Sequence, residues 1–188
     1  QLIISDDLGG SVRDAKIVIF AVPSGSLTEL VSQVTEFVTA DVFVISTSKG
    51  VYGDAFLLPS QILEQSLPSA RIGVLSGPNL AKEIASREIT ATVVASEDRE
   101  LCDTFQKLLA SNYFRVYANY DRLGVELAGA LKNIYAIVSG IAEALEAGQN
   151  TKSVVLTRSL AEMSRFGLQL GADPMTFLGL SGVGGLFV

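Results

Sequence analysis

The sequence predicts an α/β fold in which a sheet of parallel strands is followed by an all-helical region. Up to residue 120, short apolar runs rich in β-branched residues alternate with helix-like segments, as strands and helices do in α/β proteins. After residue 120 only helical spacing of apolar residues remains. We therefore expect two domains, at residues 1–120 and 121–188.

Five apolar runs are the expected strands, at residues 16–23, 41–46, 71–75, 89–95 and 114–118. They are rich in Val and Ile and show little alternation of polar and apolar residues. This pattern is typical of strands that are buried on both faces of a parallel sheet. The short run Leu2-Ile3-Ile4 could be the end of a further strand.

Helical segments lie between and after these strands. We expect helices at residues 27–38, 60–67, from about 80, 99–110, 121–149 and 152–170. The segment 121–149 is apolar and long enough for a membrane span. Its charged and polar residues, together with many Ala and Gly residues, favour a buried helix of a soluble protein instead.

Composition excludes several classes of function. The 188 residues carry a net charge of −6, which disfavours nucleic acid as a partner. The chain has no histidine and one cysteine, so it lacks a His-based catalytic triad, a disulfide scaffold and an expected metal site. No signal peptide is visible. Because the chain starts at Gln1 and stops in an apolar run at Val188, we expect both ends to be truncated.

Lys132 stands out in the expected helix 121–149, since it is the only basic residue between Arg122 and Lys152. The small residues Ala136 and Gly140 follow on the same helix face and would allow a ligand to approach the amine. Burial would lower the pKa of this lysine, which could then exchange a proton with a substrate hydroxyl. Alternatively, its side chain reaches solvent from the helix edge.

Polar residues follow three of the expected strands, and ligands bind beyond the carboxyl ends of strands in open α/β sheets. Pro23-Ser24, Lys49-Gly50 and Gly77-Pro78-Asn79 occupy these positions. Each is also common in ordinary turns. Together they could form one edge of a site, with charge from Lys49 and an amide from Asn79. Neither a G-x-G-x-x-G fingerprint between a strand and a helix nor a P-loop is present.

Five segments, in this order and spacing, resemble bacterial-type NAD(P)-dependent glycerol-3-phosphate dehydrogenases. They are Ala21-Val22-Pro23-Ser24, Ser48-Lys49-Gly50, residues 76–83 (SGPNLAKE), residues 124–133 (GVELAGALKN) and residues 157–163 (TRSLAEM). The resemblance implies an incomplete Rossmann-type domain that binds NAD or NADP, followed by an all-α substrate domain. It also implies a cytoplasmic enzyme, a possible homodimer, that interconverts sn-glycerol 3-phosphate and dihydroxyacetone phosphate and supplies phospholipid synthesis.

The resemblance also implies roles for individual residues. Lys132 looks like the catalytic base for the 2-hydroxyl. Lys49, Gly77 and Asn79, together with Lys132, look like substrate-binding residues. Lys49 and Ala81 look like cofactor-binding residues.

The chain departs from the family pattern at its two ends and at residue 185. The fingerprint strand is expected before Gln1, and a Ser-Arg-Asn segment is expected after Val188. In addition, the family reads Gly-x-Gly-Asp where this chain has Gly182-Val183-Gly184-Gly185. If the surrounding geometry is retained, Gly185→Asp should not reduce activity. Two alternatives stay open: a related 3-hydroxyacid or 6-phosphogluconate-type dehydrogenase, and a non-catalytic remnant that acts as an interaction protein.

Overall fold

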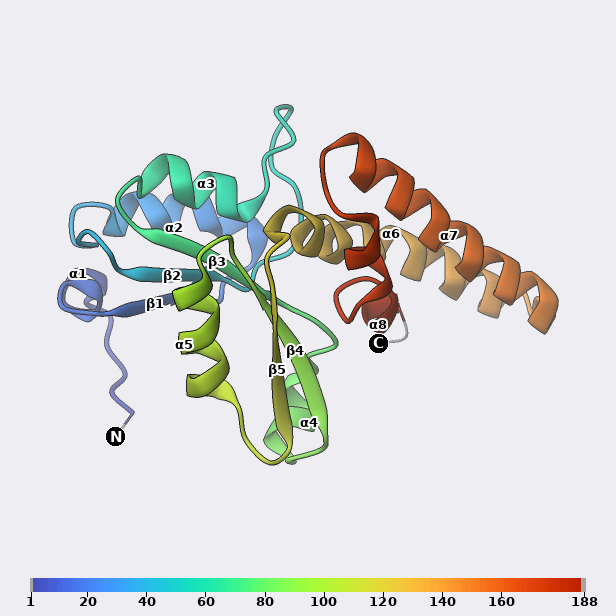
Figure 1. Ribbon diagram of the computed structural model, residues 1–188, viewed down its shortest axis with the longest axis horizontal. Coiled ribbons are helices and arrows are strands. Elements are labelled where there is room, and N and C mark those ends of the chain that lie inside the picture. Colours follow the sequence, from blue (N-terminus) through green and yellow to red (C-terminus); the bar gives the residue numbers. More distant parts are fainter. Residues whose placement is uncertain (1, 187–188) are drawn as a thin grey trace.

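The computed structural model describes residues 2–186, so residues 1, 187 and 188, with the chain ends expected to be truncated, lie outside the described part. Its centre is a five-stranded sheet with the strands in sequence order (Figure 1). The strands are β1 (Ile17–Phe20), β2 (Phe43–Ser46), β3 (Arg71–Ser76), β4 (Thr90–Ala95) and β5 (Phe114–Asn119). All five expected runs therefore contain strands, whereas residues 2–4 are exposed and form none.

The sheet is mixed, which corrects the expectation of a wholly parallel one. Strands β1, β2 and β3 are parallel, and β4 is parallel to β5, but β4 runs antiparallel to β3. A parallel return would need a connection long enough to cross the sheet, usually with a helix. The connection between β3 and β4 holds only the five-residue helix α4 (Ala81–Ala85), so β4 turns back beside β3.

Helices cover both faces of the sheet. On one face α2 (Leu27–Val34) and α3 (Pro59–Ser66) pack on β1, β2 and β3, while α5 (Arg99–Leu109) packs on the other face. Successive residues of β2 supply the two cores, because Val44 belongs to the first cluster and Ile45 to the second. The short elements α1 (Leu8–Val12) and η1 (Ser24–Ser26) flank β1.

Two long helices extend away from the sheet (Figure 1). They are α6 (Arg122–Ala144) and α7 (Gln149–Gln169), close to the expected ranges, and they are followed by η2 (Pro174–Leu178) and α8 (Val183–Leu186). The first half of α6 is buried against β3 and β4 and in a third apolar cluster. That cluster contains Leu58, Leu127, Ala128, Met163, Ala172 and Phe177.

Within the described residues, α6 is the one helix long and apolar enough to cross a membrane. Its first half, however, is buried inside the protein and carries Glu126 and Lys132, which are 7% and 8% exposed. Packing against the sheet therefore accounts for the apolar residues of the first half, whereas Ile134, Ile137, Val138 and Ile141 of the second half are exposed.

Asp121 fixes the start of α6 and ties it to η2. Its Oδ1 accepts a hydrogen bond from the Gly124 N–H at 2.9 Å, which is a helix N-cap. Its Oδ2 accepts bonds from the Asp173 N–H at 2.9 Å and from the Thr176 hydroxyl at 2.7 Å. One carboxylate thus determines how the chain returns across α6 before it reaches α8.

We expect Asp121→Ala to lower the free energy of unfolding by about 2 kcal/mol, because it removes a helix cap and the partner of a buried hydroxyl. Urea unfolding of the complete protein measures this loss. The matched control is Asp7→Ala, which removes the cap of the exposed helix α1 and should change stability by only about 0.5 kcal/mol. Equal effects of the two substitutions would contradict this account of Asp121.

Candidate active site

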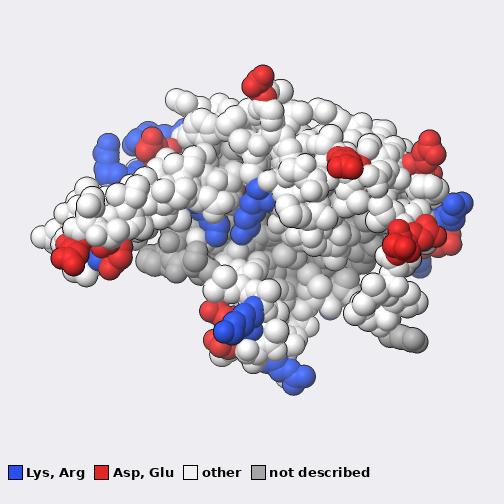
Figure 2. All heavy atoms as spheres, turned by 180° about the vertical axis from the view of Figure 1, so that it is seen from behind, with Lys and Arg blue, Asp and Glu red and all other residues white. Residues whose placement is uncertain are grey.

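The structure brings Lys49, Gly77 and Lys132 together beyond the carboxyl ends of β2 and β3. Lys49 lies in the loop after β2, Gly77 follows β3, and Lys132 lies on α6. Figure 2 shows basic side chains in the hollowed middle of one face, away from the acidic side chains at its rim. Lys49 and Lys132, two cations from distant parts of the sequence, thus lie side by side, and we call the surroundings of these two amines the recess.

Lys132 is buried, and its amine donates a hydrogen bond to the Gly185 carbonyl at 3.0 Å. The amine therefore does not extend into open solvent from the helix edge. Residue 185 faces the lysine directly, since a Cβ atom placed there would lie 2.6 Å from Lys132 Cδ and 3.1 Å from Nζ. A glycine at this position thus leaves the room that the Lys132 side chain occupies.

Lys49 is half-buried and donates a long hydrogen bond of 3.4 Å to the Gly77 carbonyl. Burial, followed by the charge of the neighbouring Lys132 and a hydrogen bond with it, lowers the pKa of Lys49 to about 8. Nothing in the local sequence indicated this effect, because it depends on a residue far along the chain. With a pKa near 8, Lys49 is still mostly protonated at neutral pH.

The close approach of α6 to the sheet occurs at Gly129. A Cβ atom at this position would lie 3.1 Å from the Ser76 hydroxyl and 3.8 Å from Lys49 Cγ. The sequence pointed instead to Ala136 and Gly140, but Gly140 has open space around it. The reason is geometric: a helical side chain leans toward the helix N-terminus, so the surface that Lys132 covers lies over the preceding turn, which contains Gly129.

Gly77 and Asn79 shape the loop between β3 and β4. Gly77 has φ +149°, and a Cβ atom there would lie 3.3 Å from the Ala91 carbonyl and from Thr92 Cα. The Asn79 side chain accepts a bond from the Thr92 hydroxyl at 2.8 Å and donates one to the Ala91 carbonyl at 3.3 Å. In this structure Asn79 therefore anchors the loop to β4.

Ala81 stands apart from the lysine pair. It is exposed and is the first residue of α4. The structure thus brings Lys49, Gly77 and Lys132 together, with Asn79 on the same loop as Gly77, whereas Ala81 is exposed at the start of α4. Gly129, Gly185 and the buried Ser76 hydroxyl also surround the two amines. The sequence did not single them out, because the residues that they contact are distant in sequence.

Two larger surface hollows lie elsewhere and do not include the lysine pair. A hollow of about 560 Å³ at the amino ends of β1 and β2 includes Arg71 in its wall. That guanidinium already pairs with Asp98 and Glu100 and stacks on the Phe43 ring. A second hollow, of about 710 Å³, is lined by Lys107 and Arg115 but by neither lysine of the pair. Among residues 2–186 no group of His, Cys, Asp and Glu side chains is arranged to hold a metal ion.

Comparisons with known proteins identify relatives for the whole chain. Residues 1–102 match the model of the NAD-dependent glycerol-3-phosphate dehydrogenase N-terminus, and residues 121–188 match the model of its C-terminus. The chain is 55% identical to glycerol-3-phosphate dehydrogenase (NAD(P)+) of Ectopseudomonas mendocina, over 98% of this chain and 54% of that protein. For the Teredinibacter turnerae enzyme of the same name, the identity is 54% over 100% of this chain and 55% of that protein.

Solved structures agree with these matches. The glycerol-3-phosphate dehydrogenase of Coxiella burnetii superposes with a TM-score of 0.90 at 32% identity, covering 96% of this chain and 55% of that one. The yeast glycerol-3-phosphate dehydrogenase gives a TM-score of 0.88 at 30% identity, covering 97% of this chain and 56% of that one. The chain spans about half the length of the curated relatives that it matches.

The lowered pKa of Lys49 predicts how stability depends on pH. Between about pH 8 and 10.5, the unfolded chain holds a proton on Lys49 that the folded protein has lost, so this group's contribution to stability rises with pH. Below pH 8 the buried charge is unfavourable in the folded state. Lys49→Met in the complete protein should therefore raise the melting temperature at pH 7, with the gain shrinking toward pH 10.

Thermal unfolding of variant and unmodified protein at several pH values checks this expectation. The matched control is Lys82→Met on the exposed helix α4, which should give the same small change at every pH. A gain for Lys49→Met that does not vary between pH 7 and 10 would show that Lys49 is fully solvated.

Proposed function

Because the chain belongs to the NAD-dependent glycerol-3-phosphate dehydrogenase family, we propose that the complete protein interconverts sn-glycerol 3-phosphate and dihydroxyacetone phosphate with NAD or NADP. The observation that carries the proposal is the buried Lys132 amine, held on the Gly185 carbonyl beside Lys49. A small anionic substrate that must lose a hydroxyl proton needs such a pair of amines.

Residues 1–120 form the dinucleotide-binding part of this proposal, and residues 121–188 form the substrate part. The carboxyl end of β1 supports a cofactor there, since the chain that follows it is largely exposed and small, with Pro23 and Ser24. Gly50, with φ +132°, faces Ser24 without a side chain between them. These residues, with Lys49 and Ala81, fit one side of a nicotinamide dinucleotide. The glycine fingerprint for its pyrophosphate is not among the 188 residues.

The proposed mechanism assigns proton transfer to Lys132. When bound, the nicotinamide accepts the hydride from C2 of glycerol 3-phosphate, and the 2-hydroxyl must lose its proton. The neutral Lys132 amine would take that proton, and in the reverse direction the ammonium would return it. Burial of the amine on α6 keeps bulk water from competing for this transfer.

Lys49 and the β3–β4 loop would position the substrate. Lys49 is mostly protonated at neutral pH and would attract the substrate phosphate and contact the cofactor. The Gly77 carbonyl accepts a hydrogen bond from the Lys49 amine, and the Asn79 side chain links this loop to β4 through a bond to the Ala91 carbonyl. In this assignment the substrate contacts of Gly77 and Asn79 come from the backbone of the loop and from the face of the amide that β4 does not use.

The proposal also includes the enzyme's location, its metabolic role and its oligomeric state. We take the enzyme to be soluble and cytoplasmic, to supply glycerol 3-phosphate for phospholipid synthesis, and to act as a homodimer. Its acidic balance of −6 fits a small-molecule enzyme better than a nucleic-acid-binding protein. The 3-hydroxyacid and 6-phosphogluconate alternative is set aside, because both family models describe glycerol-3-phosphate dehydrogenase. The retained lysine pair argues against a non-catalytic interaction protein.

Lys132→Ala in the complete enzyme should lower kcat by about 10²–10⁴-fold, the usual loss when a positioned acid–base group is removed. The assay follows oxidation of NADH or NADPH with dihydroxyacetone phosphate as substrate. Lys82→Ala on the exposed helix α4 is the control and should leave kcat unchanged. Turnover within about tenfold of the unmodified enzyme, in a variant with normal circular dichroism, would remove Lys132 from the mechanism.

Substitutions at residue 185 test how the Lys132 amine is held. Gly185→Ala adds a Cβ atom where Lys132 Cδ and Nζ lie, so it should displace the amine and reduce kcat. Gly185→Asp adds the same atom but also a carboxylate that can hold the displaced amine through a charge-assisted bond. We therefore expect Gly185→Asp to retain more activity than Gly185→Ala. The opposite order would show that contact with the carbonyl, rather than an anionic partner, is what the amine needs.

A further inference from the structure

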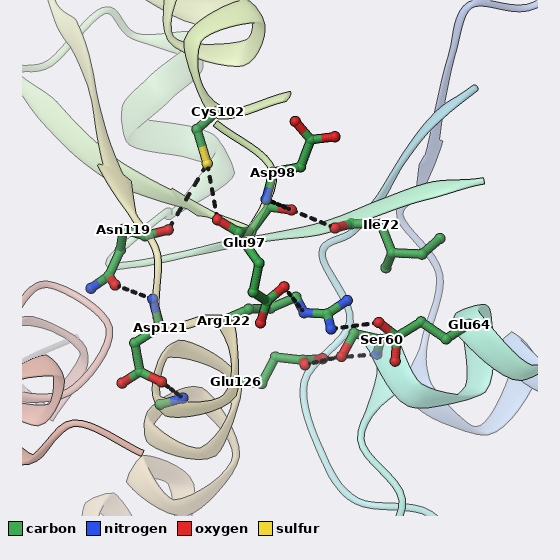
Figure 3. Close-up of polar contacts among 12 residues, drawn as sticks. Ser60, Glu64, Ile72, Glu97, Asp98, Cys102, Asn119, Asp121, Arg122 and Glu126 are labelled. Carbon is green, nitrogen blue, oxygen red and sulfur yellow. Dashed lines mark hydrogen bonds and ion pairs between the residues drawn. The ribbon is translucent and has the colours of Figure 1, made fainter. Parts of the chain in front are cut away.

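Glu126 is a buried carboxylate that the proposed mechanism does not use. It lies on α6 and is 7% exposed. Its oxygens accept the Ser60 N–H at 2.9 Å and the Ser60 hydroxyl, so both of its partners belong to one residue at the start of α3. Figure 3 shows the Glu126 side chain reaching from α6 toward Ser60 (Figure 3).

The buried position of this carboxylate is costly. Burial raises the pKa of Glu126, and the two bonds from Ser60 and the charge of Arg122 only partly oppose the shift. An uncharged contact would join α6 to α3 at lower cost. The carboxylate differs from such a contact in one respect, since it receives a backbone donor and a hydroxyl donor together and so fixes both the place and the orientation of Ser60.

The other polar link between α6 and α3 is looser. Arg122, one turn earlier on α6, pairs with Glu64 on α3 and with Glu97, as Figure 3 also shows. The side chains of Glu64 and Glu97 are 46% and 62% exposed. The Arg122 side chain is only 13% exposed, but both carboxylates reach solvent, where ion pairs contribute only about 0–1 kcal/mol and hold geometry weakly. Glu126 is therefore the contact that sets how α3 lies on α6.

The segment that enters α3 is the one that carries Lys49. After Lys49 the chain forms a small hairpin, in which Tyr52 and Leu57 exchange backbone hydrogen bonds of 2.8 and 3.1 Å. The Phe56 ring then packs edge-on against Phe166 of α7 with 6.2 Å between ring centroids. Leu58 enters the apolar cluster with Leu127 and Met163, directly before α3 begins. Segment 47–58 thus carries Lys49 near its start, contacts the helical region, and leads directly into α3, which holds Ser60.

Lys132 lies on the same helix as Glu126, six residues farther along α6. One helix therefore carries both the amine and the carboxylate that holds the Lys49 segment. We propose that Glu126 is a positioning residue: by holding Ser60 at the start of α3, it fixes segment 47–58 and so keeps Lys49 against Lys132. This inference rests on the proposed function for its purpose, but the geometry that it predicts can be measured without any turnover.

The test measures the pKa of the Lys49 amine by competitive labelling with acetic anhydride across pH, read on the Lys49 peptide by mass spectrometry. In the complete protein, Glu126→Ala should raise this pKa from about 8 by about one unit or more, because Lys49 then leaves its buried place beside Lys132. Ser60→Ala, which removes only the hydroxyl bond, should give a smaller rise. Glu126→Gln keeps an acceptor oxygen and should lie between the unmodified protein and Glu126→Ala.

The matched control is Glu97→Gln, which removes an exposed carboxylate from Arg122 and should leave the Lys49 pKa unchanged. A merely structural role for Glu126 predicts lower stability with no shift at Lys49, so an unchanged pKa in folded Glu126→Ala overturns the proposal. If that variant does not fold, Ser60→Ala and Glu126→Gln decide the matter, and no shift in either overturns it. Because labelling needs no substrate, failure of the proposed dehydrogenase activity would appear separately, as no oxidation of NADH or NADPH with dihydroxyacetone phosphate by the unmodified complete protein.

Discussion

The candidate site depends on the close packing of α6 across the carboxyl end of β3 at Gly129. At this point the helix backbone lies near the Ser76 hydroxyl and the aliphatic stem of Lys49. A larger residue would push the helix away from the sheet, and Lys132, one turn later, would move with it. The position of Lys132 beside Lys49 therefore depends on a residue without a side chain, and the charge of Lys132 adds to burial in lowering the pKa of Lys49.

Two lysines in one recess repel each other, so the surrounding structure must hold them there. Each amine is met by a backbone carbonyl, Gly77 for Lys49 and Gly185 for Lys132. Both carbonyls lie on short loops or helices that larger contacts fix: Asn79 ties the first loop to β4, and Asp121 ties the chain before α8 to the start of α6. The position of β4 matters for function here. Because β4 returns directly beside β3, the Ala91 carbonyl and the Thr92 hydroxyl lie within hydrogen-bond distance of the Asn79 side chain.

Much of the fold and part of the site could be predicted from the sequence. The strands were visible because Val and Ile runs are needed wherever a strand is buried on both faces, and Lys132 was visible as a lone cation in an apolar helix. The direction of β4 was not visible, since the residues of a buried strand do not indicate in which direction it runs beside its neighbour. The partner of the Lys132 amine and the approach at Gly129 were also missed, because a glycine shows only that space is needed, not which neighbour uses it.

Glu126 shows a further limit of such reasoning. In the sequence it served only as a charge that argues against a membrane span, since its spacing on α6 gives no partner. In the structure, the same helix carries a carboxylate for Ser60 and, farther along, the buried amine, so one rigid element holds two segments that are far apart in sequence. The cost of burying a carboxylate is offset when it receives both a backbone and a hydroxyl donor. A buried carboxylate with two donors can orient a loop, whereas apolar contacts only cover it. On α6 this carboxylate, Glu126, lies between the N-cap Asp121 and Lys132.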